Sequence, residues 1–246
     1  MSGPAWVLID GQLRRAAQAR FRLGEDPLGG QALVESLLVV KGRIRHLREH
    51  LRRLVEGCRA LAWPDRGLGE LGLSLRRLAS RSRVQRGSLR LRLWRDGRHL
   101  AFCAEARPQS GPLKLLTTAQ RHFGPEPIWG QLKSNAMLPN LLAKAETLAW
   151  ADDGLRLSPG GWVAEGVWSN LVLRKGRKVF TPPLHMGILE GVTRSLLLKG
   201  FRRRGYEVRE EPLTRYDLYT ADEVWLCSSI AGAVKVGEVD GRKVGL

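Results

Sequence analysis

The chain has 246 residues, of which 43% are hydrophobic and 26% are charged, a composition typical of a soluble globular protein with one large or two modest domains. No stretch approaches the ~20 apolar residues that span a membrane, and we expect no secretory signal. The formal net charge of +17 favours an anionic partner, either a nucleic acid or a small anionic substrate. Aromatic residues are not interleaved with the basic clusters as base stacking requires, so a nucleic acid is the less favoured partner.

The cysteines and histidines predict no metal site. The three cysteines are far apart in the sequence, which favours buried thiols in a reducing cytoplasm. His46 and His50 are four residues apart, but the glutamate that a helical zinc-protease motif places after its first histidine is missing. We therefore expect these two histidines to form a surface pair.

The first part of the chain predicts a smaller α/β domain over residues 1–107. Trp6–Ile9 followed by Asp10-Gly11 is typical of a strand and a tight turn. From Arg48 the apolar period changes to that of a helix, and Leu71–Ser80 predicts a second helix. The further predicted strands are Ala32–Val40, Arg43–Leu47, Leu89–Trp94 and Leu100–Ala106.

Residues 108–112 are polar and rich in proline and glycine, and they predict a linker to a larger domain over residues 113–246. The expected helices there are Asn140–Trp150 and Val192–Arg204. The expected strands are Leu113–Thr117, two short strands around Pro159-Gly160-Gly161, Glu207–Glu211 and Glu223–Leu226. Because strands and helices alternate in both parts, the sequence predicts an α/β or α+β fold with mixed sheets.

Lys133 and Glu165 are candidate reactive residues. Lys133 follows a Gly- and Pro-broken loop at 123–127 and has small or uncharged neighbours, and a partly desolvated lysine can attack an aldehyde. Glu165, in a small and apolar neighbourhood between a strand and a loop, could hold a proton on a pyridine nitrogen. Taken alone, each residue has an ordinary explanation as a solvated side chain.

Other residues form a candidate phosphate site. Gly191-Val192-Thr193 opens a helix, where free N–H groups and the Thr193 hydroxyl can meet a phosphate. Arg53, on the first predicted helix, and Ser229, after the strand that ends at Cys227, could add donors. In isolation, these features are also explained by a helix N-cap and solvated side chains.

In their order along the chain, these segments resemble the fold-type IV pyridoxal-phosphate enzymes, which include branched-chain and D-amino-acid aminotransferases and aminodeoxychorismate lyase. The resemblance covers most of the chain, from Asp10-Gly11 to Asp240-Gly241. The motifs that carry it are Lys133 with its helix, Glu165-Gly166 with Asn170, Thr181-Pro182-Pro183-Leu184, Gly191-Val192-Thr193-Arg194 and Ala221-Asp222-Glu223-Val224.

The resemblance implies pyridoxal 5'-phosphate as the cofactor, with Lys133 as the Schiff-base lysine and Glu165 as the partner of the pyridine nitrogen. It assigns the cofactor phosphate to a group of residues from three segments. These residues are Arg53, Val192, Thr193 and Ser229. The resemblance also implies two domains with the cofactor between them, and a cytoplasmic homodimer that completes the site.

The sequence differs from the family pattern near the expected substrate pocket. Val34 stands where an aromatic residue usually precedes the position of Glu35, and the Arg95–Arg98 turn is shorter than the family's Arg-Gly loop. Val34 and Arg95 lie at positions that the resemblance assigns to the substrate pocket, so they are the candidate substrate-binding residues. The asparagine usually found three residues after the lysine stands at Asn135, two residues after it.

The resemblance favours aminodeoxychorismate lyase, because short chains in this family are more often lyases than transaminases. We also expect the chain to lack the family's usual last helix. The alternative function is an aminotransferase of branched-chain or D-amino acids. A third hypothesis, from another class, is a basic nucleic-acid-binding protein.

Overall fold

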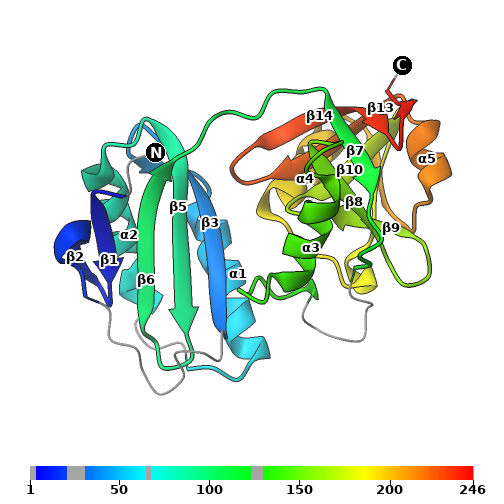
Figure 1. Cartoon of the computed structure of the whole chain (residues 1–246). Helices are drawn as coiled ribbons and strands as arrows, with labels where there is room; N and C mark the ends of the chain where they lie inside the picture. The colour runs from blue at the N-terminus through cyan, green and yellow to red at the C-terminus, as the bar shows by residue number, and fades with distance from the viewer. Residues whose placement is uncertain (1–3, 21–30, 65–67, 123–129, 246) are drawn as a thin grey trace. The chain divides into compact units, whose positions relative to one another are not determined.

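The computed structural model describes residues 4–20, 31–64, 68–122 and 130–245, so the loop noted at 123–127 lies outside the described residues. The chain forms two compact units (Figure 1). The first contains Met1–Pro108 together with Lys133–Ala136, and the second contains Gln109–Leu132 and Met137–Leu246. The mixed α/β fold predicted from the sequence is confirmed.

The first unit is built on an antiparallel sheet with the strand order β2-β1-β6-β5-β3-β4. Its strands are β1 (Trp6–Ile9), β2 (Gln12–Arg15), β3 (Ala32–Val40), β4 (Arg43–Ile44), β5 (Arg86–Trp94) and β6 (His99–Glu105), and a 3₁₀ turn spans Ala16–Gln18. The turn at Asp10-Gly11 has positive φ at both residues, as a two-residue hairpin turn requires. The strands predicted at Trp6–Ile9 and Ala32–Val40 are confirmed with their exact bounds.

Two helices cover this sheet, α1 (Leu47–Ala60) against β3 and α2 (Leu68–Ser82) against β1 and β6. Both helices bury leucines, and Leu37, Leu89 and Leu91 of the sheet are almost completely buried. The strand expected over Arg43–Leu47 is wrong beyond Ile44. His46 adopts a left-handed conformation with φ of 53°, and α1 begins at the next residue, so the strand cannot continue.

The second unit is built on a nine-stranded mixed sheet with the order β12-β11-β10-β13-β14-β7-β8-β9, and β15 pairs with β14. The pairs β7–β8, β7–β14 and β11–β12 are parallel, and the others are antiparallel. The strands are β7 (Leu113–Thr117), β8 (Asp153–Leu157), β9 (Val163–Gly166), β10 (Asn170–Lys175), β11 (Lys178–Thr181), β12 (Glu207–Glu210), β13 (Glu223–Ser228), β14 (Gly232–Val239) and β15 (Arg242–Lys243).

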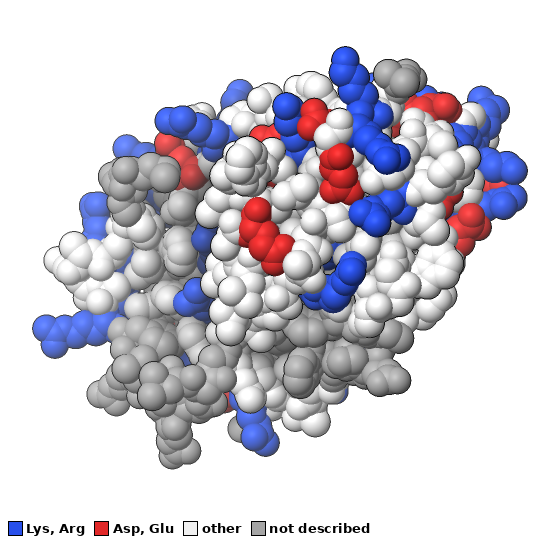
Figure 2. All heavy atoms as spheres, turned by 45° about the vertical axis from the view of Figure 1, so that its right-hand side comes forward, with Lys and Arg blue, Asp and Glu red and all other residues white. Residues whose placement is uncertain are grey.

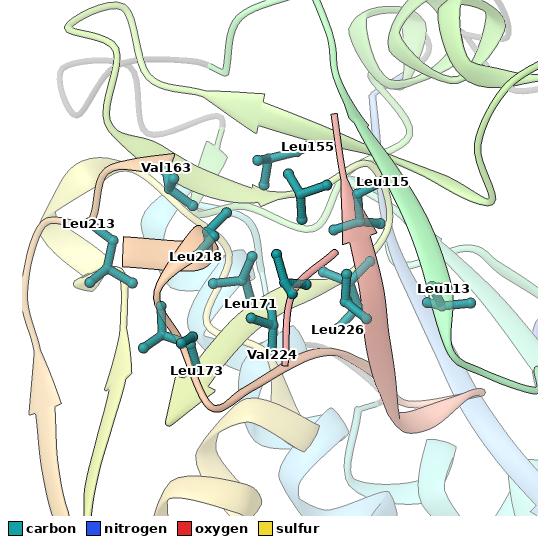
Figure 3. Packing of buried hydrophobic residues seen from close by; sticks show 14 of the residues in the cluster. Leu113, Leu115, Leu155, Val163, Leu171, Leu173, Leu213, Leu218, Val224 and Leu226 are labelled. Carbon is teal, nitrogen blue, oxygen red and sulfur yellow. The ribbon is translucent and has the colours of Figure 1, made fainter. Parts of the chain in front are cut away.

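Two apolar clusters hold the second unit together. The larger one joins residues from β7 to β10, β13 and β14 with Leu213 and Leu218 (Figure 3). The smaller one contains Leu198 and Cys227, on which Phe201 packs. The helices are α3 (Leu138–Thr147), α4 (Val192–Arg203) and α5 (Arg215–Tyr219), with a 3₁₀ turn at Leu184–Met186. The helix predicted over Val192–Arg204 is confirmed to within one residue, and Gly205, with a φ of 76°, follows it without strain.

Basic side chains on one face of the molecule are mixed with acidic ones rather than gathered in one stripe (Figure 2). On the face seen in Figure 2, Lys and Arg side chains alternate with Asp and Glu side chains. In the part of the chain that the structure describes, no helix is both long and apolar enough to cross a membrane.

Candidate active site

Glu165 lies inside strand β9 and not between a strand and a loop as the sequence suggested, and its carboxylate is buried. The ring of His122, itself 3% exposed, donates from Nε2 to Oε1 of Glu165 at 3.0 Å. On the other side, Asn170 Nδ2 donates to Oε2 at 2.9 Å, and the Leu189 N–H lies 3.4 Å from the same oxygen. Buried and held from two sides, this carboxylate has a fixed orientation.

Asn170 connects Glu165 to the start of helix α4. Its Nδ2 also donates to the Leu189 carbonyl at 2.9 Å, and a Cβ built on Gly191 would lie 1.9 Å from its Oδ1. Only glycine therefore fits at position 191, the residue that precedes α4. The Gly191 side of the helix has no side-chain cap. The first N–H groups of a helix have no acceptor within it, so the start of α4 at Val192 and Thr193 is a candidate site for an anion.

Arg194 fixes the first turn of α4 to strand β11. Its buried guanidinium donates from Nε to Thr181 Oγ1 at 3.2 Å and from Nη2 to the Pro182 carbonyl at 2.8 Å. Nη2 also lies 2.8 Å from Glu210 Oε2. The motifs Thr181-Pro182-Pro183 and Gly191–Arg194, which are separate in the sequence, are thus joined by one side chain. The last predicted residue of this unit, Ser229, follows β13 directly and is half-buried.

Lys133 belongs to a short extended segment that pairs with strand β3 in the first unit. Its carbonyl accepts from Val34 N–H at 2.8 Å, and Asn135 bonds Ala32 through both its N–H and its side chain. A β-bridge joins Ser134 to Leu33. The backbone of Lys133 is therefore held by the first residues of β3, which β4 does not reach, next to the predicted substrate residue Val34, which is buried.

Arg53 reaches Glu35 on the same strand. Its Nε and Nη2 donate to the two carboxylate oxygens of Glu35 at 2.8 and 2.7 Å, and His50 Nδ1 lies 2.7 Å from Oε2. His50 and Arg53 are three residues apart on α1, so they face the strand together. The expected surface pair of His46 and His50 is wrong: His50 is 1% exposed and serves this carboxylate, whereas His46 is exposed.

The charges around Glu35 make the stability of the folded protein depend on pH. Burial acts to raise the pKa of Glu35, but the charge of Arg53 and the hydrogen bonds from His50 and Arg53 outweigh it and lower the pKa to about 2. Because the folded pKa lies below the ordinary value of 4.5, the ionised form stabilises the fold. This stabilisation is complete above pH 4.5 and is lost as the pH falls toward 2.

Replacing Glu35 with glutamine is therefore expected to destabilise the protein at pH 7 by on the order of 3 kcal/mol, and by progressively less below pH 4.5. Urea unfolding of both proteins between pH 7 and pH 3 measures the difference. The control is Glu56→Gln, because Glu56 pairs with Arg52 on the surface of α1, where an ion pair contributes little. A constant difference between wild type and Glu35→Gln at every pH would contradict this charge effect.

Arg95 lies in the four-residue turn between β5 and β6, and its side chain is exposed. The neighbouring Arg98 donates from Nε to Asp96 Oδ2 at 2.5 Å. Among the described residues, no group of three or more histidine, cysteine, aspartate or glutamate side chains could hold a metal ion.

A pocket of about 220 Å³ opens in the second unit beside β7 and β13. Lys144, Asp153, Ser169 and Ser228 give it polar walls, and burial raises the pKa of Asp153. None of the predicted site residues lines this pocket, although Ser169 and Ser228 precede Asn170 and Ser229. In the second unit, the predicted site residues Glu165, Val192 and Thr193 lie instead at the buried carboxylate and the start of α4.

Comparison with known proteins finds relatives and solved structures that are similar to this chain. A proposed branched-chain-amino-acid aminotransferase of Methanocaldococcus jannaschii is 32% identical over 223 residues, 89% of this chain and 68% of that protein. An aminodeoxychorismate lyase of Bacillus subtilis is 35% identical over 149 residues, 57% of this chain and 49% of that protein. The branched-chain aminotransferase structure of Thermobaculum terrenum in its PLP form superposes with a TM-score of 0.87 at 20% identity, covering 98% of this chain and 88% of that one.

The pattern of the class IV amino-transferase family matches residues 32–239. This range includes Lys133, Glu165 and the start of α4, and it spans most of the chain. The protein therefore belongs to the class IV aminotransferase family, the fold-type IV enzymes whose cofactor is pyridoxal 5'-phosphate.

Proposed function

We propose that this protein is a pyridoxal 5'-phosphate-dependent lyase that converts 4-amino-4-deoxychorismate into p-aminobenzoate and pyruvate. The observation that carries the proposal is the buried Glu165 carboxylate, which His122 and Asn170 hold in the unit that also contains the start of α4. An anion fixed in this way suits a protonated pyridine nitrogen, and a helix start suits a phosphate.

The residues present fit the cofactor. Glycine at position 191 makes room for the Asn170 side chain that holds Glu165, since any Cβ there would meet Asn170. We assign the phosphate to the N–H groups of Val192 and Thr193, the Thr193 hydroxyl, the Ser229 hydroxyl and the Arg53 guanidinium. Because Glu35 takes the Nε and Nη2 donors of Arg53, it also fixes the plane in which the guanidinium lies.

The bound cofactor would supply an electron sink that weakens the C–H bond at the carbon bearing the substrate amine. Lys133 would bond covalently to the cofactor's aldehyde until the substrate amine displaces it. The freed Lys133 amine would then take the proton from that carbon. Glu165 would keep the proton on the pyridine nitrogen while charge develops in the ring. The bond from the neighbouring carbon of the substrate ring to the enolpyruvyl oxygen would then break, and the electrons left by the proton would form the double bond that makes this ring aromatic. Lys133 would return to its place and release p-aminobenzoate, and the enolpyruvate would take up a proton to become pyruvate.

The aminotransferase is the second candidate, favoured by the archaeal relative, whose match covers 89% of this chain. An aminotransferase must bind the carboxylates of two substrates in turn. Two parts of the usual aminotransferase pocket wall are reduced in this chain. The turn between β5 and β6, in which Arg98 bonds Asp96, is short, and the small Val34 side chain replaces an aromatic one. These two features support the lyase.

We further propose a homodimer in the cytoplasm. Four leucines on and after α3 are exposed together with a tryptophan, and an apolar surface of this kind marks protein contacts. These residues are Leu138, Leu141, Leu142, Leu148 and Trp150. The three cysteines are buried thiols, which supports a reducing compartment.

The test offers the purified enzyme aminodeoxychorismate, made in place from chorismate by its synthase. Parallel reactions contain 2-oxoglutarate with a branched-chain amino acid or with D-alanine. A lyase needs no second substrate, so we expect fast release of p-aminobenzoate and pyruvate without a keto acid, and only slow amino transfer from amino acids. The synthase mixture without this enzyme is the control. Rapid glutamate formation without any p-aminobenzoate would reverse the order of the two candidates.

A further inference from the structure

Arg156 is a buried arginine that faces Glu165 across two paired strands. It lies on β8, is 1% exposed, and is the direct partner of Glu165 in the antiparallel register of β8 and β9. Residues directly opposite in such a pair lie on the same face of the sheet. The guanidinium Nη2 donates to the Arg121 carbonyl at 3.3 Å, which holds it beside the segment that carries His122.

Arg156 supplies a permanent positive charge at this point. Burial lowers the pKa of its guanidinium, and the charge of Glu165 acts in the opposite direction. An arginine in a protein nevertheless stays protonated. Burying such a charge is costly unless an anion compensates for it, and Glu165 is the anion directly opposite.

Among the described residues, His122 and Cys227 are further ionisable groups that interact with Glu165. His122 donates to it from the segment after β7. The Cys227 thiol of β13 interacts with both Glu165 and Arg194, and burial raises its pKa to about 12, so it stays neutral. The guanidinium of Arg194, on α4, donates to Thr181, Pro182 and Glu210. Unlike an imidazole, whose charge changes near neutral pH, the guanidinium of Arg156 acts at every working pH.

We propose that Arg156 is a positioning residue that holds Glu165 in its ionised form and so keeps the proton on the pyridine nitrogen of the cofactor; this inference rests on the function proposed above. A carboxylate and a pyridine nitrogen that share one proton exist in two forms, one ionic and one neutral. A positive charge beside the carboxylate favours the ionic form, in which the nitrogen carries the proton. The residue acts through Glu165 and without contact with the substrate.

The experiment follows the ring nitrogen directly and needs no turnover. The apoprotein is loaded with pyridoxal 5'-phosphate labelled with ¹⁵N in the ring, and the ¹⁵N chemical shift is recorded between pH 6 and pH 10. Wild type is compared with Arg156→Met, which removes the charge at similar size, and with Arg156→Lys, which keeps it. Arg174→Met is the matched control, because Arg174 pairs with Asp222 and Glu223 instead.

We expect the ring nitrogen to lose its proton about one pH unit lower in Arg156→Met than in wild type, whereas Arg156→Lys and Arg174→Met titrate like wild type. Identical titrations of Arg156→Met and wild type would overturn the proposal. If Arg156→Met does not fold, Arg156→Gln replaces it, with the same expected shift. A folded wild-type protein that does not bind the labelled cofactor would instead overturn the proposed function itself, and this inference with it.

Discussion

Replacing Lys133 with alanine is expected to abolish turnover while the protein still binds pyridoxal 5'-phosphate without a covalent bond. The proposed phosphate contacts of Arg53, Val192 and Thr193 do not involve Lys133, so they remain. The lost amine would otherwise form the covalent link and move the proton. Proton transfer by a positioned side chain contributes ~10²–10⁴-fold to the rate, and loss of the covalent link adds to this.

The measurement combines turnover with the location of the covalent link. Borohydride reduction of the wild-type protein should remove the visible absorbance band and fix the cofactor on the peptide that contains Lys133, as mass analysis can show. Lys114→Ala is the matched control, because Lys114 lies exposed on β7 beside Glu238. Near-normal turnover by Lys133→Ala, or a reduced adduct on another lysine, would contradict the assignment.

Local signals in the sequence were sufficient for most elements. The turn at Asp10-Gly11 needs positive φ at both residues, and few residue pairs provide it. Strand β3 has a long apolar run, and the stop of α4 at Gly205 uses the residue that best adopts a left-handed conformation. Each of these features depends on a few neighbouring residues, so an isolated sequence shows it.

Features that depend on tertiary pairing were not visible in the same way. The exposed fraction of His50 depends on Glu35, 15 residues earlier on a different element. Its spacing of three from Arg53 was the available signal, since both residues face one carboxylate. Strand β14 was not predicted, because its alternating small, charged and apolar residues gain their order only between β13 and β7.

The candidate site shows the same division. Lys133 and Glu165 stand out because their motifs occur in the family order along the chain. His122 and Arg156 do not, because their relation to Glu165 arises from the register of β8 with β9 and from the path of the segment after β7. No spacing in the sequence predicts which residue of β8 will face Glu165.

Replacing Arg53 with alanine should weaken cofactor binding more than it slows the enzyme at saturating cofactor, because a phosphate contact is the same in ground and transition states. The same change leaves Glu35 with His50 alone, so some loss of stability is also expected. Urea unfolding separates that loss from the cofactor affinity. The expected loss of cofactor affinity in Arg53→Ala contrasts with the effect expected for Glu165, the proposed partner of the pyridine nitrogen.

Replacing Glu165 with alanine is expected to do the reverse and lower kcat by roughly 10- to 100-fold at saturating cofactor, with a smaller change in cofactor affinity. A hydrogen bond to a charged group contributes about 1.5–3 kcal/mol, and here it strengthens as charge develops in the ring, so its loss appears in the rate. Cofactor affinity is measured by absorbance titration and kcat by product release, with Glu238→Ala as the surface control. A large fall in affinity with unchanged kcat would instead make Glu165 a simple binding residue.

A second substitution at this position separates packing from charge. In Glu165→Ala, His122 and Asn170 lose the carboxylate that orients them. Glu165→Gln should restore part of their packing but not the rate, since a neutral amide cannot hold the pyridine proton through its charge.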